Sequence, residues 1–195
     1  MLVFQSAVIN KFDNLKKMVL KKRKSFIKKE NRPIVHIKFT RNDYISESLS
    51  IIAFLAMWLL TFYAIVIASL PGTIPIHFNL KGAPDGYGKK LNLLITPLVS
   101  TVIYIGMTII NRYPHLFNYP VKINEKNAVE QYLLATRIIR LIKLVIMLLF
   151  FIIEFFIIKS VLYNRPFVAF WFVLIIPAFF YVLFIFYILR SIKVK

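Results

Sequence analysis

Three side chains that can bind a metal ion or exchange a proton, His77, Asn79 and Asp85, fall within one short Gly- and Pro-rich stretch. One His and one carboxylate are fewer than the three or four protein ligands that zinc usually takes. The stretch also lacks the spacing of a phosphate-cradling loop. Cysteine is absent, which excludes thiolate sites. We therefore predict no metal site, no cofactor and no catalytic residue, and expect a protein that is not an enzyme; an envelope enzyme using His77 and Asp85 is a lesser alternative.

The same stretch contains strong turn signals. Pro84, Asp85 and Gly86 follow one another, and Pro presets one dihedral, Asp bonds its own backbone and Gly accepts positive φ. Gly82 and Gly88 add two permissive positions. We predict an ordered loop with a turn at Pro84–Gly86. Its candidate ligand-binding residues are His77, Phe78, Asn79, Asp85, Gly86 and Lys89.

A further carboxylate, Glu154, lies inside a long apolar run. It is about 16 Å along a helix from Lys143, at a rise of about 1.5 Å per residue. An ionised carboxylate in a membrane costs a few kcal/mol and usually marks a paired charge or a polar path. The alternatives are protonation, pairing with Lys159 or with Lys89 or Arg165, and a path for a transported substrate.

Composition shows what must position these groups. The chain of 195 residues is 59% hydrophobic, above the roughly 45–50% of soluble domains. A bilayer core needs about 20 apolar residues in helical form. Four segments qualify, residues 49–70, 93–110, 141–162 and 166–189, so we predict an all-α membrane protein with four transmembrane helices in a membrane domain spanning 49–189. The short Tyr163–Arg165 link makes the last two a tight antiparallel hairpin.

The distribution of Lys and Arg predicts the orientation of these spans. Twelve basic residues flank the spans on one side and five on the other, and the richer side is normally cytoplasmic. Both chain ends are then inside, with an outer loop at 71–92, a cytoplasmic loop at 111–140 and a basic tail at 190–195.

The first 32 residues carry many Lys residues beside an apolar face formed by Val8, Phe12, Leu15 and Val19. A basic amphipathic segment of this kind usually lies on anionic headgroups, so membrane lipids are the expected partner of the +18 chain. A cytoplasmic protein partner is the alternative, and nucleic acid is not expected. Residues 33–48 read as a linker, extended over Pro33–Phe39.

Between the second and third spans, Asn127 and Glu130 resemble a capping box, which predicts a helix that starts there and continues into the third span. Arg137, Arg140 and Lys143 are spaced by three and form a basic stripe, which we interpret as a membrane anchor. His36 and His115 are read as solvated or interfacial residues.

The stretch Leu70–Lys90 reads Leu-Pro-x-x-Ile-Pro-x-His-Phe-Asn-x-x-Gly-x-Pro-Asp-Gly-x-Gly-x-Lys. This pattern resembles the membrane domain shared by SdpI-type immunity proteins and many bacterial relatives grouped as a domain of unknown function. The resemblance covers about residues 33–159. It continues into a cytoplasmic motif: Asn111, Pro114, Phe117, Asn118, Tyr119, Pro120, Asn127, Gln131, Tyr132, Arg137 and Arg140.

The resemblance implies a multi-pass protein of the bacterial cytoplasmic membrane. One branch of the family protects its producer from a secreted membrane-active toxin and signals by drawing a repressor to the membrane. That immunity protein has additional spans, and the basic segment 1–32 is not shared. The leading hypothesis is a sensor or immunity protein whose outer loop meets a peptide toxin or envelope ligand, with a cytoplasmic regulator as a further partner. The alternative is a transporter component using Glu154, in which case four spans without an internal repeat suit a homo-oligomer.

Overall fold

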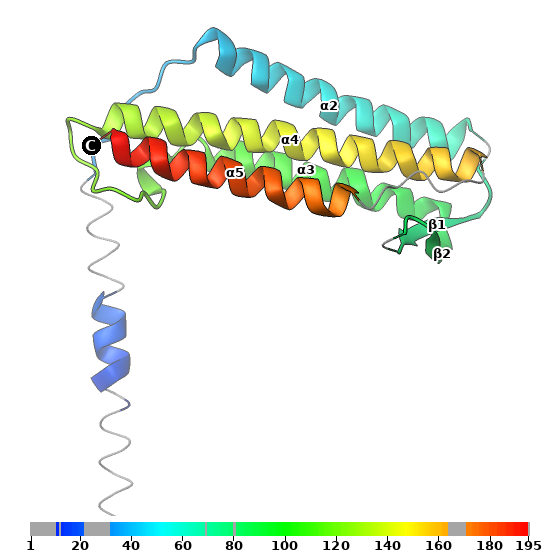
Figure 1. Ribbon diagram of the computed structural model, residues 1–195, viewed down its shortest axis with the longest axis horizontal. Coiled ribbons are helices and arrows are strands. Elements are labelled where there is room, and N and C mark those ends of the chain that lie inside the picture. Colours follow the sequence, from blue (N-terminus) through cyan, green and yellow to red (C-terminus); the bar gives the residue numbers. More distant parts are fainter. Residues whose placement is uncertain are drawn as a thin grey trace, which may run out of the picture.

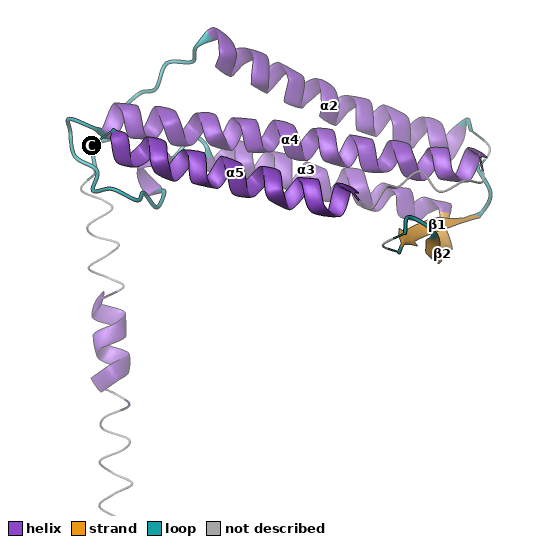
Figure 2. Ribbon diagram, viewed as in Figure 1, coloured by secondary structure: helices purple, strands orange, loops and turns teal. Residues whose placement is uncertain are grey.

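The computed structural model describes residues 11, 13–21, 32–68, 70–79, 81–163 and 171–194. Four helical stretches in this part of the chain are long and apolar enough to cross a membrane, as predicted. They are α2 (Arg41–Val66), α3 (Ile95–Ile110) with the preceding 3-10 turn η1 (Lys90–Leu94), α4 (Ala128–Tyr163) and α5 (Trp171–Lys193) (Figures 1 and 2). Residues 164–170 fall outside the described residues, and with them the predicted tight link between the last two spans and the start of the fourth.

Helix α4 is the centre of the bundle. It contacts α2, α3 and α5, and α2 also contacts α3 (Figure 1). Its 36 residues form one continuous helix from Ala128, which confirms that the segment before the third span is helical. At about 1.5 Å per residue α4 is about 54 Å long, so it extends well beyond a hydrocarbon core of about 30 Å.

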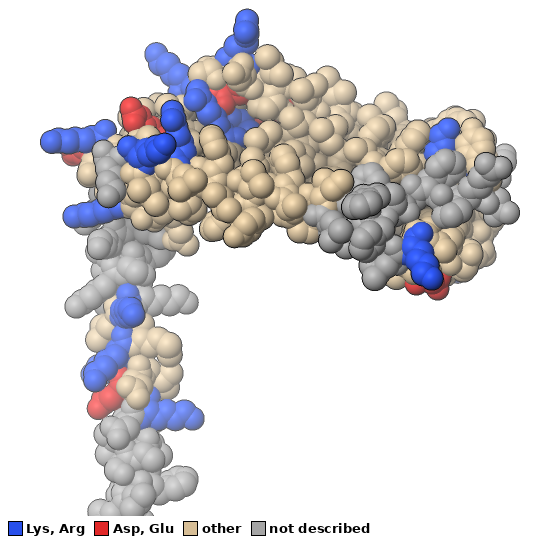
Figure 3. Space-filling model, viewed as in Figure 1, with Lys and Arg blue, Asp and Glu red and all other residues tan. Residues whose placement is uncertain are grey.

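Most of the helix surface is apolar and exposed, as expected where lipid replaces water. Only 6% of the apolar window of α5 is buried inside the protein. In the space-filling view, Lys and Arg gather at the end of the bundle opposite the β-strands, and the visible surface in the middle of the bundle carries neither sign of charge (Figure 3). We call these two ends the basic end and the hairpin end.

The first helix starts eight residues before the predicted start at Leu49. The cause is a helix cap: the Asp43 carboxylate accepts hydrogen bonds from the backbone N–H of Thr40 at 2.8 Å and from its hydroxyl at 2.7 Å. A reciprocal cap of this kind satisfies the amides that begin a helix. Helix α2 therefore contains the charged residues Asp43 and Glu47 ahead of its apolar part.

The predicted outer loop contains a β-hairpin, so the expectation of an all-α protein is corrected to a mostly helical one. Strands β1 (Thr73–Phe78) and β2 (Pro84–Lys89) pair antiparallel, with an irregular register around Ile76 (Figure 2). The predicted turn at Pro84–Gly86 is wrong, because these residues begin β2. Pro is tolerated there because it is the first residue of a strand that lies at the edge of a two-stranded sheet.

The turn lies between the strands and is closed by Asn79. Its side-chain oxygen accepts the backbone N–H groups of Lys81 at 2.9 Å and Ala83 at 3.1 Å. Gly82 has a φ of 78°, a conformation that Gly adopts without strain. The prediction of a permissive position at Gly82 is thus confirmed, whereas the Pro-Asp-Gly signal is used inside a strand.

At the basic end, the linker before α2 runs extended along the bundle, as predicted. Val35 and Ile37 pack on a cluster made by Ile123, Ala128 and Tyr132. The predicted capping box at Asn127 is wrong. The Asn127 side chain accepts a hydrogen bond from the Asn124 backbone N–H at 2.9 Å and donates one to the Lys122 carbonyl at 3.0 Å, both in the loop before the helix. Asn127 therefore orders the loop before α4.

The amphipathic amino-terminal segment is described only in part. Residues 13–21 are helical and exposed. Val8, Phe12 and the basic residues between 22 and 29 lie outside the described residues, so the predicted apolar face is seen only at Leu15 and Val19, which are 46% and 63% exposed.

Candidate functional site

The hairpin is held firmly against the ends of three helical elements. Ile74 of β1 is fully buried and belongs to a cluster with Ala64 of α2, Leu93 of η1 and Ile158 of α4. The backbone N–H of Lys90 also donates to the Gly72 carbonyl at 3.0 Å. Because one face of β1 is fixed in this way, the side chains on the other face have defined positions.

On that open face, His77 and Asp85 form a pair. The Nδ1 atom of His77 lies 2.5 Å from Oδ1 of Asp85, and the side chains are 72% and 42% exposed. Gly86 lies opposite His77, and a Cβ atom on Gly86 would come within 2.9 Å of the His77 Cβ. Gly86 is thus needed for the close approach of the strands.

The other hairpin residues predicted to bind a ligand have different positions. Asn79 is engaged in the turn, so its oxygen does not join His77 and Asp85. Phe78 is half-buried and Lys89 is exposed at the far end of β2, where it pairs in register with Thr73. The structure therefore brings two of the six candidates, His77 and Asp85, into direct contact and places Gly86 beside them.

Glu154 is completely buried between the helices, nearer the hairpin end. The hydroxyl of Thr61 on α2 donates to its Oε1 at 3.0 Å, whereas its Oε2 has no hydrogen-bond partner among the described residues. None of the ion pairs formed by the described residues includes Glu154. Pairing with Lys159, one of the alternatives, is not observed; the Lys159 ammonium lies over the Tyr163 ring at 4.7 Å.

At the basic end, the basic stripe of α4 is paired with carboxylates of α2. Arg140 donates from Nη2 at 2.8 Å and from Nε at 3.2 Å to the Asp43 carboxylate, and both side chains are at most 3% exposed. Phe39 stacks on the Arg140 guanidinium at 4.5 Å. Arg137, which is 47% exposed, lies 3.5 Å from the same carboxylate.

Lys143, about one helical turn after Arg140 on α4, forms a second ion pair with α2. Its ammonium donates to Glu47 at 2.7 Å and to the Thr108 hydroxyl of α3 at 3.0 Å, and its side chain is 1% exposed. The interpretation of Arg137, Arg140 and Lys143 as a simple anchor is therefore corrected. Arg140 and Lys143 join three helices through buried charges, and Arg137 alone keeps a largely solvated position.

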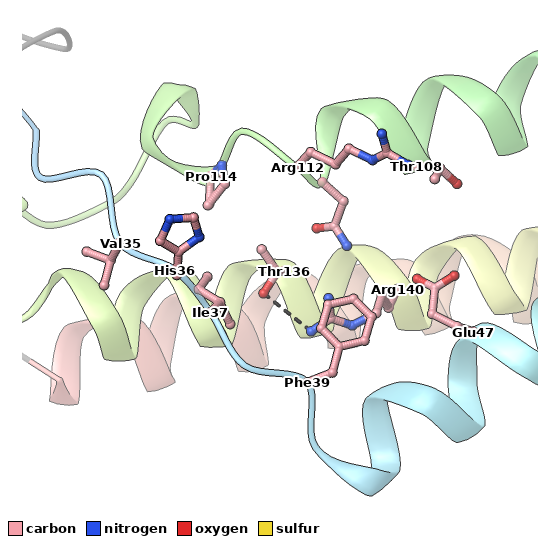
Figure 4. Close-up of a pocket in the computed structure, with 11 residues that line it drawn as sticks. Val35, His36, Ile37, Phe39, Glu47, Thr108, Arg112, Pro114, Thr136 and Arg140 are labelled. Carbon is pink, nitrogen blue, oxygen red and sulfur yellow. Dashed lines mark hydrogen bonds between the residues drawn. The ribbon is translucent and has the colours of Figure 1, made fainter.

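A cavity of about 400 Å³ opens between the linker, the end of α3 and helix α4 (Figure 4). Phe39 covers Arg140 on one side, and the Nη2 atom of Arg140 donates a hydrogen bond to the Thr136 hydroxyl at 3.4 Å. The other lining residues are Val35, His36, Ile37, Glu47, Thr108, Asn111, Arg112 and Pro114. The buried Oδ1 of Asn111 has no hydrogen-bond partner among the described residues.

The residues that resembled a family motif build this end of the molecule. Asn111, Pro114 and Arg140 line the cavity. Tyr119 donates to the Pro114 carbonyl at 2.9 Å, and burial raises the pKa of its phenol, so it remains a neutral donor. Asn127 orders the loop, and Asn118 and Pro120 are exposed.

The acidic partners Asp43 and Glu47 and the hydroxyl groups of Thr61 and Thr108 were not predicted from the sequence. Asp43 and Glu47 are four residues apart on one face of α2, and Arg140 and Lys143 are three apart on α4. Matching these two short charge patterns was the available signal. Thr61 offered none, because a lone Thr in an apolar run has no distinguishing pattern.

Comparison with known proteins gives two matches. Residues 52–101, from α2 through the hairpin to α3, match the model of a domain of unknown function (DUF1648). A protein of Archaeoglobus fulgidus described as uncharacterized is 35% identical over 80 residues, which cover 37% of this chain and 43% of that protein, so the match spans less than half of the relative. No solved structure matches. The chain is a membrane-type protein, and the segment that matches DUF1648 contains most of the first span and the whole β-hairpin.

Proposed function

We propose that this chain is a multi-pass protein of a bacterial cytoplasmic membrane that binds an extracellular peptide toxin or envelope ligand through its β-hairpin, and that it acts in immunity or sensing. Both chain ends and the basic end would lie in the cytoplasm, where basic residues are normally retained. The observation that carries the proposal is the exposed His77–Asp85 pair on a hairpin whose other face is buried in the bundle.

The surface around this pair suits a peptide. Ile76 and Tyr87 are 44% and 63% exposed, so the hairpin that carries the imidazole and the carboxylate also offers apolar contacts. Exposed aromatic and aliphatic side chains beside polar groups are typical of binding surfaces. A rigid hairpin also loses little entropy when a ligand binds.

We propose binding and not catalysis. Within the described residues, no three side chains of His, Cys, Asp or Glu gather at one place. His77 and Asp85 are open to water, whereas acid–base groups with a catalytic role usually lie in a cleft. A chelator-sensitive activity that is lost in the His77 variant would favour an enzyme.

The test is survival of a toxin-sensitive bacterium that expresses this chain and is challenged with secreted membrane-active peptides. The double variant His77→Ala/Asp85→Ala is compared at equal membrane abundance with Lys81→Ala, an exposed turn residue outside the pair. Protection by the wild type and by Lys81→Ala, but not by the double variant, supports the proposal. Equal survival of all strains, with and without the chain, rejects it.

A second candidate function is transport, which the buried carboxylate of Glu154 favours. An unpaired acid between helices is typical of coupled substrate paths. Glu154→Gln keeps the acceptor for the Thr61 hydroxyl but removes the charge. Loss of transport or of proton coupling in Glu154→Gln would favour the second candidate, whereas unchanged toxin protection would favour the hairpin.

A further inference from the structure

We propose that the cavity at the basic end binds a phosphate group, supplied by a phospholipid headgroup at the membrane surface. This site lies at the opposite end of the bundle from His77 and Asp85 (Figure 1), so it does not depend on the function proposed for the hairpin.

The first observation is a set of donors without partners. Among the described residues, no hydrogen bond or ion pair occupies the side chains of His36 and Arg112, and none engages the Nη1 atom of Arg140. All three residues line the cavity. Guanidinium groups match the tetrahedral oxygens of phosphate in geometry and charge.

The second observation is the side-chain amide of Asn111, whose buried Oδ1 atom has no hydrogen-bond partner among the described residues. A buried polar atom without a hydrogen bond costs about 1–3 kcal/mol, which a ligand could remove. Rotation of the amide by half a turn exchanges oxygen for nitrogen, so the same position can donate to a phosphate oxygen. Asn111 can therefore meet either an oxygen or a hydroxyl of the same headgroup.

The third observation is the local charge. Asp43 is matched by Arg140, and Glu47 is matched by Lys143. Arg137 also lies 3.5 Å from the Asp43 carboxylate, whereas none of the ion pairs among the described residues includes Arg112. Arg112 therefore brings to the cavity a positive charge that these two carboxylates do not neutralise. The Asp43 carboxylate also fixes the position of Arg140, so a ligand would meet an ordered guanidinium group. Glu47, the carboxylate that lines the cavity, is already bound by Lys143.

The fourth observation is the position of the cavity along the bundle, which matches the level of lipid headgroups. Thr108 and Asn111 stand at the end of α3, where its apolar residues finish, and Glu47 precedes the apolar part of α2. Headgroups lie at this level, next to the hydrocarbon core. Val35, Ile37 and Phe39 supply an apolar wall for the first carbons of the lipid.

The experiment uses the purified full chain in detergent. Its thermal unfolding and its retained ligands in native mass spectrometry are measured with dioctanoyl phosphatidylglycerol, with dioctanoylglycerol, which lacks phosphate, and with inorganic phosphate. The test variant is Arg112→Gln, an exposed position whose change leaves the buried ion pairs intact. The matched control is Arg190→Gln, an exposed Arg on α5 that does not line the cavity.

We expect phosphatidylglycerol to bind the wild type and Arg190→Gln alike and to bind Arg112→Gln about tenfold more weakly, as the loss of one charge-assisted hydrogen bond implies. If inorganic phosphate alone gives the same tenfold difference, the site takes phosphate from a free source; if it has no effect, the source is the lipid. Binding of dioctanoylglycerol as tight as that of phosphatidylglycerol overturns the proposal. So does an equal response of the two Arg variants, or no binding by the wild type.

Discussion

At the scale of single residues, the most consequential contact is between Asp43 and Arg140. Both are nearly inaccessible, and the Asp43 carboxylate also caps α2 through Thr40. One acid therefore starts a helix and fixes it to another. Loss of either partner leaves a buried charge without its counter-charge.

This contact gives the first prediction. Asp43→Leu and Arg140→Leu should each lower the free energy of unfolding by about 3–5 kcal/mol, whereas the double variant should recover much of that loss. The measurement is unfolding in mixed micelles of SDS and a mild detergent. Arg190→Leu, at an exposed site, should change little. Additive losses in the double variant would show that the two residues do not act as a pair.

At the scale of elements, the hairpin depends on two Gly residues. A Cβ atom on Gly88 would come within 2.8 Å of the Ile76 side chain and 2.5 Å of the Asn92 side chain, and one on Gly86 would crowd His77. A Cβ on Gly72 or Gly106 would meet nothing within 4 Å. Close contacts thus explain Gly86 and Gly88, and the positive φ in the turn explains Gly82.

The second prediction follows. Gly86→Ala should destabilise the hairpin by about 1–3 kcal/mol, because the added methyl group would overpack the strands at the Cβ atom of His77. Gly88→Ala should cost less, because the atoms that its methyl group would meet are the ends of the flexible Ile76 and Asn92 side chains. Gly72→Ala and Gly106→Ala are the controls, and Gly106→Ala should stabilise α3 by up to about 1 kcal/mol. Proteolysis of the hairpin in detergent, followed by mass spectrometry, measures the difference. Equal cleavage of all four variants would contradict this account of the strands.

The elements also show what sequence could and could not predict. The spans followed from long apolar runs, and the continuity of α4 followed from the absence of a breaker. The strands could not be predicted, because their alternation of apolar and polar residues is interrupted by Pro75, Pro84, Gly86 and Gly88. The turn depends on hydrogen bonds to the Asn79 side chain, which no residue pattern indicates. The matching charge patterns on α2 and α4 were a signal for the pair of Asp43 and Arg140, but the contact itself was not predicted, because its members are 97 residues apart and meet only after the helices pack.

At the scale of the whole molecule, the charge distribution and the two ends can be tested together. Basic residues cluster at one end, and the hairpin occupies the other (Figure 3). The sequence has no Cys, so a single introduced Cys can be labelled without background. The hairpin turn and the loop before α4 offer exposed positions for it.

The third prediction concerns orientation. In intact cells, Lys81→Cys should react with a membrane-impermeant maleimide, and Lys126→Cys should react only after the membrane is permeabilised, because the basic end stays inside. The reagent is detected by a shift in gel mobility. Labelling of Lys126→Cys in intact cells would show that the predicted orientation is wrong and that the proposed phosphate-binding cavity faces the outside.

The ion pairs between α2 and α4 also constrain the order in which the protein can be built. During synthesis the first two spans emerge long before Arg140 and Lys143 exist, so Asp43 and Glu47 must wait in the hydrated interface, where an unpaired carboxylate is tolerated. The arrival of the third span supplies the counter-charges and lets the amino-terminal turns of α2 seat against the bundle. A nascent chain that ends before Ala128 therefore lacks both ion pairs, and the contacts that fix the amino-terminal turns of α2 to α4 form only in a late step of assembly.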